Sequence, residues 1–234
     1  ISCESEKYPK SWVIAELGEL GTFAKGKGIS KEDLREIGFR CILYGDLYTT
    51  YDFFIDKVNK FVDKKISKQS QHIKKGDVLF AGSGETIEEI GKAATYISME
   101  RAFAGGDVII FTPYNQVYPE SLSYLLESDF VRKQKRRLGQ GHSVVHIYPK
   151  DLAKLMIPLP PLPEQRAIAA CLSTWDEAIS KTNELIAQKE LRKKWLMQKL
   201  LTGKMRLKGF SRVWIETRIL HLFKPEKRYV QWNE

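Results

Sequence analysis

The feature that most constrains the fold is a long stretch free of helix breakers. From Glu164 to Leu201 the sequence contains neither proline nor glycine, and Gly203 follows shortly after. At 1.5 Å per residue, these 38 residues predict a helical rod about 57 Å long. Apolar or small residues recur along it in alternating steps of four and three, which is typical of a coiled-coil seam. These residues are Ile168, Leu172, Trp175, Ile179, Thr182, Ile186, Leu196 and Leu200.

Two positions of this seam carry Lys189 and Lys193 instead of apolar residues. A long helix with one apolar stripe needs a second helix to cover that stripe, so we expect a dimer or subunit interface along it. The alternative is an ordinary helix that packs on its own domain.

The segment before this helix is rich in proline. IPLPPLPEQ, residues Ile157–Gln165, contains four prolines. Proline lacks an amide hydrogen and restricts the residue before it, which predicts a stiff extended arm that is neither helix nor central strand. A ligand for a proline-reading domain is the alternative to a structural linker.

Residues 1–157 are long enough to bury a core of their own. Strand-like content and turn signals predict strands over Ser11–Phe23, Cys41–Tyr48, Asp77–Ala81, Asp107–Thr112 and Ser143–Ile147. Apolar residues at three- and four-residue steps predict one helix over Pro119–Arg137. We therefore expect an α+β (mixed α/β) globular domain, followed over residues 158–208 by the proline-rich arm and a long coiled-coil-forming α-helix.

The tail resembles the beginning of the chain. SWVIAELGEL at Ser11–Leu20 and VWIETRILHL at Val213–Leu222 share a tryptophan and two later apolar positions. This faint repeat predicts that residues 209–234 begin a second copy of the first domain.

Composition excludes several classes of protein. No apolar run reaches the roughly 18 residues that a membrane span needs. The N-terminal ISCESEKYPKSW lacks the basic start and apolar stretch of a secretory signal. Cys3, Cys41 and Cys171 fit neither a disulfide framework nor a zinc site, and we expect them to be reduced thiols of a cytoplasmic protein.

The net charge of +9 is concentrated at one end of the chain. Residues 1–180 carry 24 basic and 24 acidic side chains, whereas residues 181–234 carry 14 and 5. Overall basicity therefore says nothing about nucleic-acid binding by the first 180 residues, and local clusters must carry that argument.

Catalytic signatures are absent from the sequence. Gly82–Ala94 (GSGETIEEIGKAA) resembles a phosphate loop but has six residues, not four, between Gly84 and Gly91, and Ala93 replaces the magnesium-binding hydroxyl. The pair His142 and His146 falls on a predicted strand, where a four-residue step does not bring side chains to one metal. We expect neither an active site nor a metal site.

The remaining polar features suit a nucleic-acid interface. Cations attract phosphates, and arginine or glutamine can read base edges through bidentate hydrogen bonds. Short loops with glycine allow close backbone approach to a ligand. The candidate DNA-binding residues are Lys25, Lys27, Ser83, Thr86, Arg132, Lys133, Lys135, Arg136, Arg137, Gln140 and His142. For each cluster the alternative is a solvated surface.

The segment from IPLPPLPEQRAIAA to LLTGKMRLKGF closely resembles the central conserved region of the DNA-specificity subunits of type I restriction–modification enzymes. PKSWVIAELGEL, GKGISKEDLREIGFRCILYGDLYT, KKGDVLFAGSGET and GHSVVHIYPKDLAKLMIPLP look like parts of a target recognition domain of that family. The resemblance covers nearly the whole chain.

This resemblance implies sequence-specific recognition of double-stranded DNA with a split target, and no catalysis by the chain itself. It implies modification (methyltransferase) subunits and restriction (translocase–nuclease) subunits as partners. S-adenosylmethionine, ATP and Mg are expected in those partners, with no cofactor in this chain.

The sequence departs from the family pattern because it has one recognition domain, one helix and the beginning of a second domain. We expect either a natural half-subunit that forms a homodimer through the long helix or a truncated product. The interface residues would be Ile168, Leu172, Trp175, Ile179, Ile186, Leu196 and Leu200. Two other functions are weighed against this one: a self-contained nuclease or methyltransferase, and a coiled-coil scaffold whose globular domain binds protein.

Overall fold

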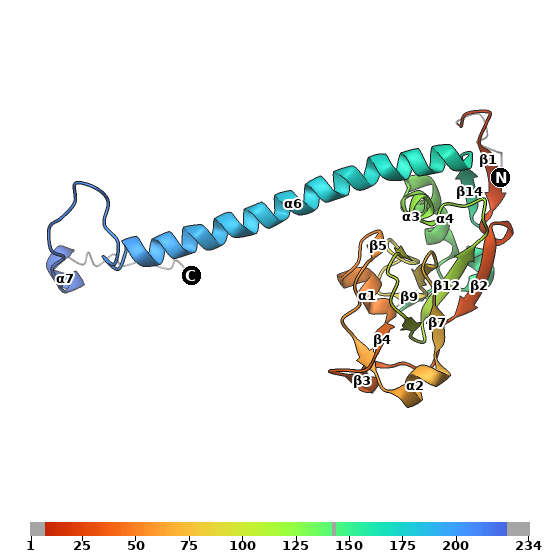
Figure 1. Ribbon diagram of the computed structural model, residues 1–234, viewed down its shortest axis with the longest axis horizontal. Helices are drawn as coiled ribbons and strands as arrows, with labels where there is room; N and C mark the ends of the chain where they lie inside the picture. The colour runs from red at the N-terminus through yellow and green to blue at the C-terminus, as the bar shows by residue number, and fades with distance from the viewer. Residues whose placement is uncertain (1–7, 142–143, 224–234) are drawn as a thin grey trace, which may run out of the picture. The chain divides into compact units, whose positions relative to one another are not determined.

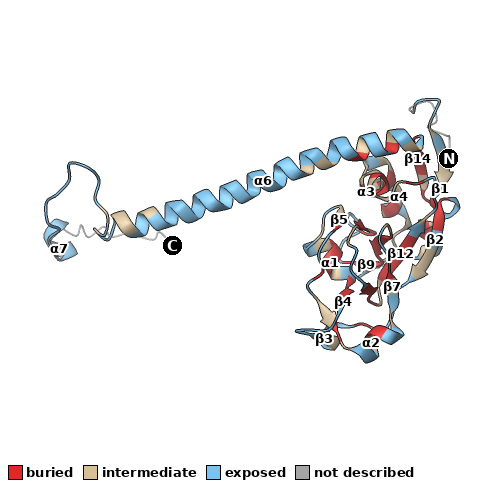
Figure 2. Ribbon diagram, in the orientation of Figure 1, coloured by how far each residue is buried: buried red, intermediate tan, exposed pale blue. Residues whose placement is uncertain are grey.

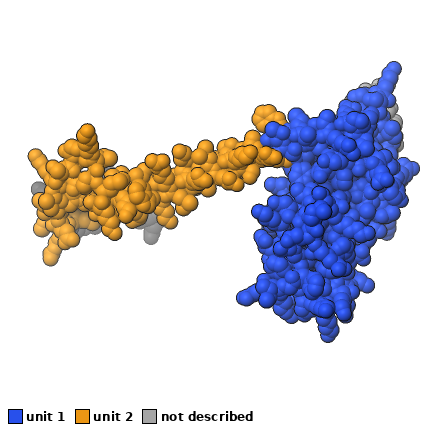
Figure 3. Space-filling view, viewed as in Figure 1, with its two compact units in different colours: residues 1–174 blue, residues 175–234 orange. Residues whose placement is uncertain are grey.

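The structure, a computed structural model, describes residues 8–141 and 144–223. The chain forms two compact units, residues 1–174 and residues 175–234 (Figure 3). The first unit is a mixed α/β domain, and a long helix continues from it into the second unit (Figure 1). The predicted fold class is thereby confirmed. Within the described residues, no helix is both long enough and apolar enough to cross a membrane.

The central sheet of the first unit has five strands in the order β2-β12-β8-β10-β5. Their bounds are Gly21–Lys25 (β2), Val108–Pro113 (β12), Val78–Ala81 (β8), Ala93–Tyr96 (β10) and Phe54–Ile55 (β5). β5 pairs with β10 in parallel, and the other neighbours pair antiparallel. Every residue of β8 and β10 is buried, as expected for strands covered on both faces. The strands expected at Asp77–Ala81 and Asp107–Thr112 are confirmed.

A second five-stranded sheet has the order β3-β6-β4-β11-β7. Its strands are Leu34–Arg35 (β3), Phe61–Val62 (β6), Phe39–Ile42 (β4), Ala102–Ala104 (β11) and Gln71–Ile73 (β7). Two ribbons complete the strands: β1 (Val13–Glu16) with β14 (Met156–Leu159), and β9 (Ser83–Gly84) with β13 (Val145–His146). The helices of this unit are η2 (Leu17–Glu19), η3 (Lys31–Asp33), α1 (Tyr44–Thr49), α2 (Lys64–Gln69), α3 (Pro119–Leu126), α4 (Asp129–Leu138) and α5 (Pro149–Leu152).

The core lies on both faces of the central sheet because side chains alternate along each strand. Phe80 and Phe111 face one way and join a cluster that includes Leu122 of α3 and Val131 of α4. Leu79 and Ile110 face the other way and meet residues of the second sheet and of α1. Figure 2 shows the buried strands within the first unit and the exposed surface of the long helix.

The strand expected over Cys41–Tyr48 is wrong for its second half. β4 ends at Ile42 and α1 begins at Tyr44. The Asp46 carboxylate accepts a hydrogen bond from the Leu43 amide at 2.9 Å, which stabilises the start of a helix. Leu47 is fully buried on the inner face of that helix. The aromatic content of this segment was a misleading strand signal.

The single helix expected over Pro119–Arg137 is two helices. α3 ends at Leu126 and α4 begins at Asp129. Ser128 has an extended backbone, and its hydroxyl donates a hydrogen bond to the Leu125 carbonyl at 2.6 Å. Serine side chains compete with helical hydrogen bonds in this way, so the chain turns between the two helices.

The expected proline arm is shorter than predicted. β14 pairs with β1 in the register Val13↔Leu159, so the boundary expected at residue 157 falls inside a strand of the first unit. A two-stranded ribbon tolerates proline at its edge. The long helix α6 spans Leu162–Leu200 and includes Pro163, because a proline in the first helical turn has no amide bond to lose. The expectation that Ile157–Gln165 contains no helix is therefore wrong.

The first turns of α6 are fixed to the first unit by Gln165. This buried side chain accepts from the Tyr118 amide at 2.7 Å and donates to the carbonyls of Gln116 and Pro160 at 3.0 and 2.8 Å. Trp12 Nε1 also donates to the Glu164 carboxylate at 3.2 Å. These bonds attach the start of α6 to the first compact unit, which continues to Thr174.

The expected second repeat, residues 209–234, lies partly outside the described residues. Val213–Arg218 forms no strand, and α7 occupies Ile219–Leu222. In the first copy, β1 is a strand because β14 pairs with it. Val213 and Ile215 are 87% exposed.

Candidate nucleic-acid interface

Helix α4 has an inner face that anchors it and an outer face that is basic. Val131 is buried in the core. The Gln134 side chain donates to the Met156 carbonyl at 3.0 Å and accepts from the Met156 amide at 2.9 Å, which ties α4 to β14. At 100° per residue, positions 132, 133, 136 and 137 fall on one side of the helix, away from Val131 and Gln134. The outer face carries Arg132, Lys133, Arg136 and Arg137, all exposed or half-buried.

Lys135 was expected on the DNA face, and this expectation is wrong. Its side chain is 3% exposed, and Nζ donates to Glu127 at 2.8 Å and to the Gly91 carbonyl at 3.0 Å. Burial lowers the pKa of Lys135, while the Glu127 carboxylate acts in the opposite direction. Lys135 therefore joins α4 to the end of α3 and to the segment before β10, and the outer face keeps four of the five predicted cations.

Replacing Lys135 with methionine should destabilise the fold without changing DNA affinity. The variant leaves the largely buried Glu127 carboxylate without its partner, which costs about 3 kcal/mol of unfolding free energy. Urea denaturation measures this cost, and Glu127→Gln in the same chain should recover part of it. If the Lys135→Met variant is stable but binds DNA more weakly, Lys135 is part of the interface after all.

The β9–β13 ribbon lies at the C-terminal end of α4. Gln140 and His146 exchange two backbone hydrogen bonds, of 2.9 and 2.7 Å, so the exposed Gln140 stands beside the ribbon. Ser83 is buried, and its hydroxyl lies 2.9 Å from His146 Nδ1. The expectation that Ser83 faces a ligand is wrong. Thr86 is exposed, as expected, and His142 lies outside the described residues.

Three residues of this ribbon and its continuation were not among the predicted interface residues. The His146 and Tyr148 rings stack at 6.4 Å between centroids, and Lys150 Nζ lies 5.8 Å from the Tyr148 ring centroid. His146 was weighed only as a metal ligand, which hid its place beside Gln140. A signal was available in the alternation of polar and apolar residues from Val145 to Tyr148.

Lys25 and Lys27 lie on the loop that follows β2. Lys25 pairs with the Asp107 carboxylate at 3.7 Å, and the Asp107 carbonyl accepts from the Gly82 amide at 2.8 Å. Lys25 is thereby linked to the segment that enters β9. Lys27 is exposed, and its neighbour Gly28 lies beside Ser70 at the end of α2. The structure thus connects Lys25 with the β9 segment, but Lys27 with another element.

Among the residues that the structure describes, no group of three or more His, Cys, Asp or Glu side chains could hold a metal ion. The outer face of α4, Gln140 and the exposed ribbon residues instead present cations and hydrogen-bonding groups on a surface. Such a surface can bind phosphates and base edges.

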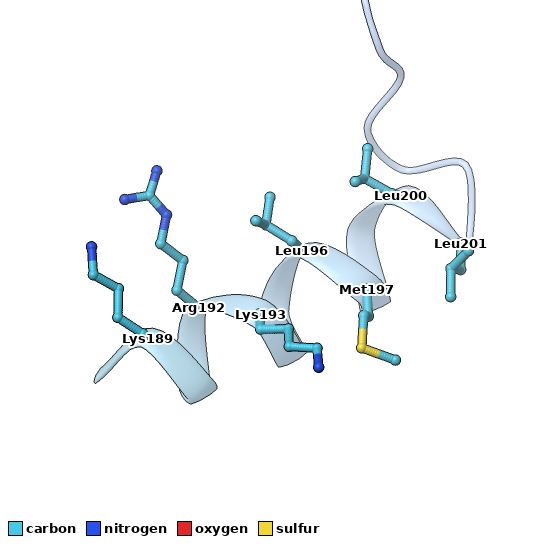
Figure 4. A pocket seen from close by; sticks show the side chains of 7 residues that line it. All are labelled: Lys189, Arg192, Lys193, Leu196, Met197, Leu200 and Leu201. Carbon is cyan, nitrogen blue, oxygen red and sulfur yellow. The ribbon is translucent and has the colours of Figure 1, made fainter. Parts of the chain in front are cut away.

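The expected stripe on α6 is exposed over most of its length. Ile168 is half-buried near the first unit, whereas Trp175 is 68% and Ile179 58% exposed. Leu172 and Ile186 are also exposed. Near the end of the helix, Leu196 and Leu200 are half-buried and point to the same side (Figure 4). They border an open groove of about 360 Å³ whose other lining residues are Lys189, Arg192, Lys193, Met197 and Leu201.

Fold and site together define a mixed α/β domain with a cationic helix face, joined to a long helix whose apolar stripe is exposed over most of its length. A model of the type I restriction modification DNA specificity domain matches residues 9–190. The chain therefore belongs to this family, which confirms the resemblance found in the sequence.

Two similar proteins support this membership. The specificity subunit of the type I restriction enzyme EcoKI from Escherichia coli K12 is 28% identical over 173 residues, which cover 72% of this chain and 37% of that protein. The putative MjaX specificity subunit from Methanocaldococcus jannaschii is 30% identical over 222 residues, 89% of this chain and 50% of that protein. The chain thus spans half or less of the length of these two relatives.

Solved structures show the same fold. A chain from a type I restriction–modification complex has a TM-score of 0.60 and 21% identity, over 85% of this chain and 47% of its own length. The S subunit of the type I system from M. genitalium has a TM-score of 0.56 and 20% identity, over 80% of this chain and 45% of that subunit.

Proposed function

We propose that this chain recognises a DNA sequence on behalf of separate methyltransferase and nuclease subunits. The observation that carries the proposal is the outer face of α4, where four cations stand beside Gln140 on a helix fixed by buried hydrogen bonds. Arginine and glutamine are suited to reading base edges, and lysine to binding phosphates. A rigid support favours specificity because the backbone that carries the reading side chains is already ordered before binding.

The proposed active form is a homodimer joined by antiparallel α6 helices. The uncovered stripe supports this form, because each helix of a two-fold pair can cover the stripe of the other. One recognition domain would then lie at each end of a helical spacer about 58 Å long, and the dimer would read two half-sites with unread base pairs between them.

Chemistry is assigned to the partner subunits. Modification subunits would bind S-adenosylmethionine, and restriction subunits would use ATP and Mg, while this chain would determine the DNA sequence at which they act. Because the sequence has no glycine loop for a methyl donor, the purified chain should not bind S-adenosylmethionine. Calorimetric titration tests this prediction, and one-to-one binding at micromolar affinity would contradict it.

Binding to duplex DNA at several salt concentrations tests the recognition function itself. A DNA-binding complex releases counterions, so its affinity should fall steeply as salt rises. The complex of this chain with modification subunits should also prefer a target over random duplex. Binding that ignores both salt and sequence would favour a protein-binding scaffold instead.

A further inference from the structure

A second cationic surface lies on α2, a helix that contains none of the candidate residues. Between Lys57 and Lys75 the chain carries seven lysines and a single acidic residue, Asp63. Three of these lysines are exposed on α2 and border, with Gln69, a shallow depression of the surface. Lys27 belongs to the same surface because its neighbour Gly28 lies beside Ser70. We call Lys27, Lys64, Lys65 and Lys68 the lysine ridge.

The lysine ridge is not neutralised by carboxylates. Within the described part of the chain, none of its four lysines forms an ion pair, whereas the nearby Lys60 is paired with Asp46. Asp63 is occupied as the helix cap and accepts from the Ile66 amide at 2.9 Å. Lys64 and Lys68 are four residues apart on one helix, where like charges repel. An anion placed over the ridge would remove that repulsion.

A series of contacts links the lysine ridge to the candidate interface. The segment entering β9 is bonded at Gly82 to the Asp107 carbonyl, and the Asp107 side chain pairs with Lys25. Two residues later comes Lys27, beside the end of α2. In Figure 1, α2 lies at the lower end of the first unit and α3 and α4 at its upper end. A ligand that reaches both surfaces must therefore be long.

We propose that the lysine ridge binds phosphates of the duplex outside the base pairs read by α4. This inference rests on the proposed function and adds a sequence-independent contact to it. Lysine is a compact charge that binds phosphate without the directional fork of arginine. Lysine is also depleted at protein–protein interfaces. The apolar residue of α2, Ile66, packs inward against the cluster around Cys41, so the helix offers no apolar anchor to a protein partner.

The pair Lys64→Gln and Lys68→Gln tests the ridge, and Lys10→Gln with Lys154→Gln is the matched control. Both variants lose two positive charges, but Lys10 and Lys154 lie near β1 and α5, and the exposed Lys154 gives up only a long contact of 3.9 Å with Asp151. The probes are two 40-base-pair duplexes, one of random sequence and one that contains the target, bound by the full chain and by its complex with modification subunits. The ridge variant should bind roughly tenfold or more weakly at physiological salt, and its plot of log affinity against log salt should be shallower by about two units.

Three outcomes are distinguished. Equal weakening of target and random duplex, with the control variant unchanged, supports the ridge. The ridge proposal is overturned if the variant is folded, as judged by circular dichroism, and its salt slope is unchanged. It is also overturned if the variant no longer assembles with modification subunits while its salt slope is unchanged. If the wild-type complex itself shows no preference for a target, the proposed function fails, whatever the ridge variant does.

Discussion

Replacing Leu172 and Ile179 with aspartate should turn the proposed homodimer into a monomer. Both side chains belong to the exposed stripe of α6, and in a helix pair they would lie in the apolar contact. An unpaired carboxylate buried at such a contact costs several kcal/mol, and a two-fold interface carries each substitution twice. The fold of the first unit should not change, because its own hydrogen bonds at Gln165 lie before these positions.

Sedimentation equilibrium at tens of micromolar measures this effect. Ser173→Asp with Ser180→Asp is the matched control. Each serine follows a stripe residue but lies outside the stripe, and the two substitutions add the same charge as the test variant. The wild-type chain and the control should be dimers. A monomeric wild-type chain, or an aspartate variant that still dimerises, would refute the interface.

Replacing Arg132, Arg136 and Arg137 together with alanine should abolish target recognition. Each base-reading arginine contributes about 1–3 kcal/mol of discrimination, so the triple variant should lose at least a hundredfold in affinity for the target. The fold should persist, since Val131, Gln134 and Lys135 hold α4 from its inner face. Filter binding by the complex with modification subunits measures the loss.

The control for the arginine variant removes three charges elsewhere, at Lys10, Lys57 and Lys154, all of which are exposed. This control should weaken binding slightly and equally for all sequences. If the arginine variant still binds its target with wild-type affinity, the interface is not on α4.

The long helix could be predicted from sequence because its signal is local. The absence of proline and glycine and a sustained seam define α6 almost to its ends. Its first residues were mistaken because proline was treated as a helix breaker, although Pro163 lies in the first turn. Strands β8 and β12 were predicted because they are buried on both faces and read as continuous apolar runs.

The short strands could not be predicted in the same way. β5, β6 and β9 have two residues each, and they are strands only because distant segments pair with them. The site shows the same limit. A charge run identified α4, but only packing decides that Lys135 points inward while Arg136 points outward. In the lysine ridge, Lys64, Lys65 and Lys68 are close in the sequence, and only the contact between Gly28 and Ser70 shows that Lys27 lies beside them.

The most direct test of the account is the sequence of the sites that the assembled methyltransferase modifies. DNA treated with modification subunits and this chain should be mapped by sequencing that detects methylated bases. A two-fold dimer presents the same reading surface twice, so the modified sites should share an inverted repeat separated by a fixed unread spacer. Methylation without any shared sequence, or the same pattern when the chain is left out, would contradict the claim that this chain determines which DNA sequence is modified.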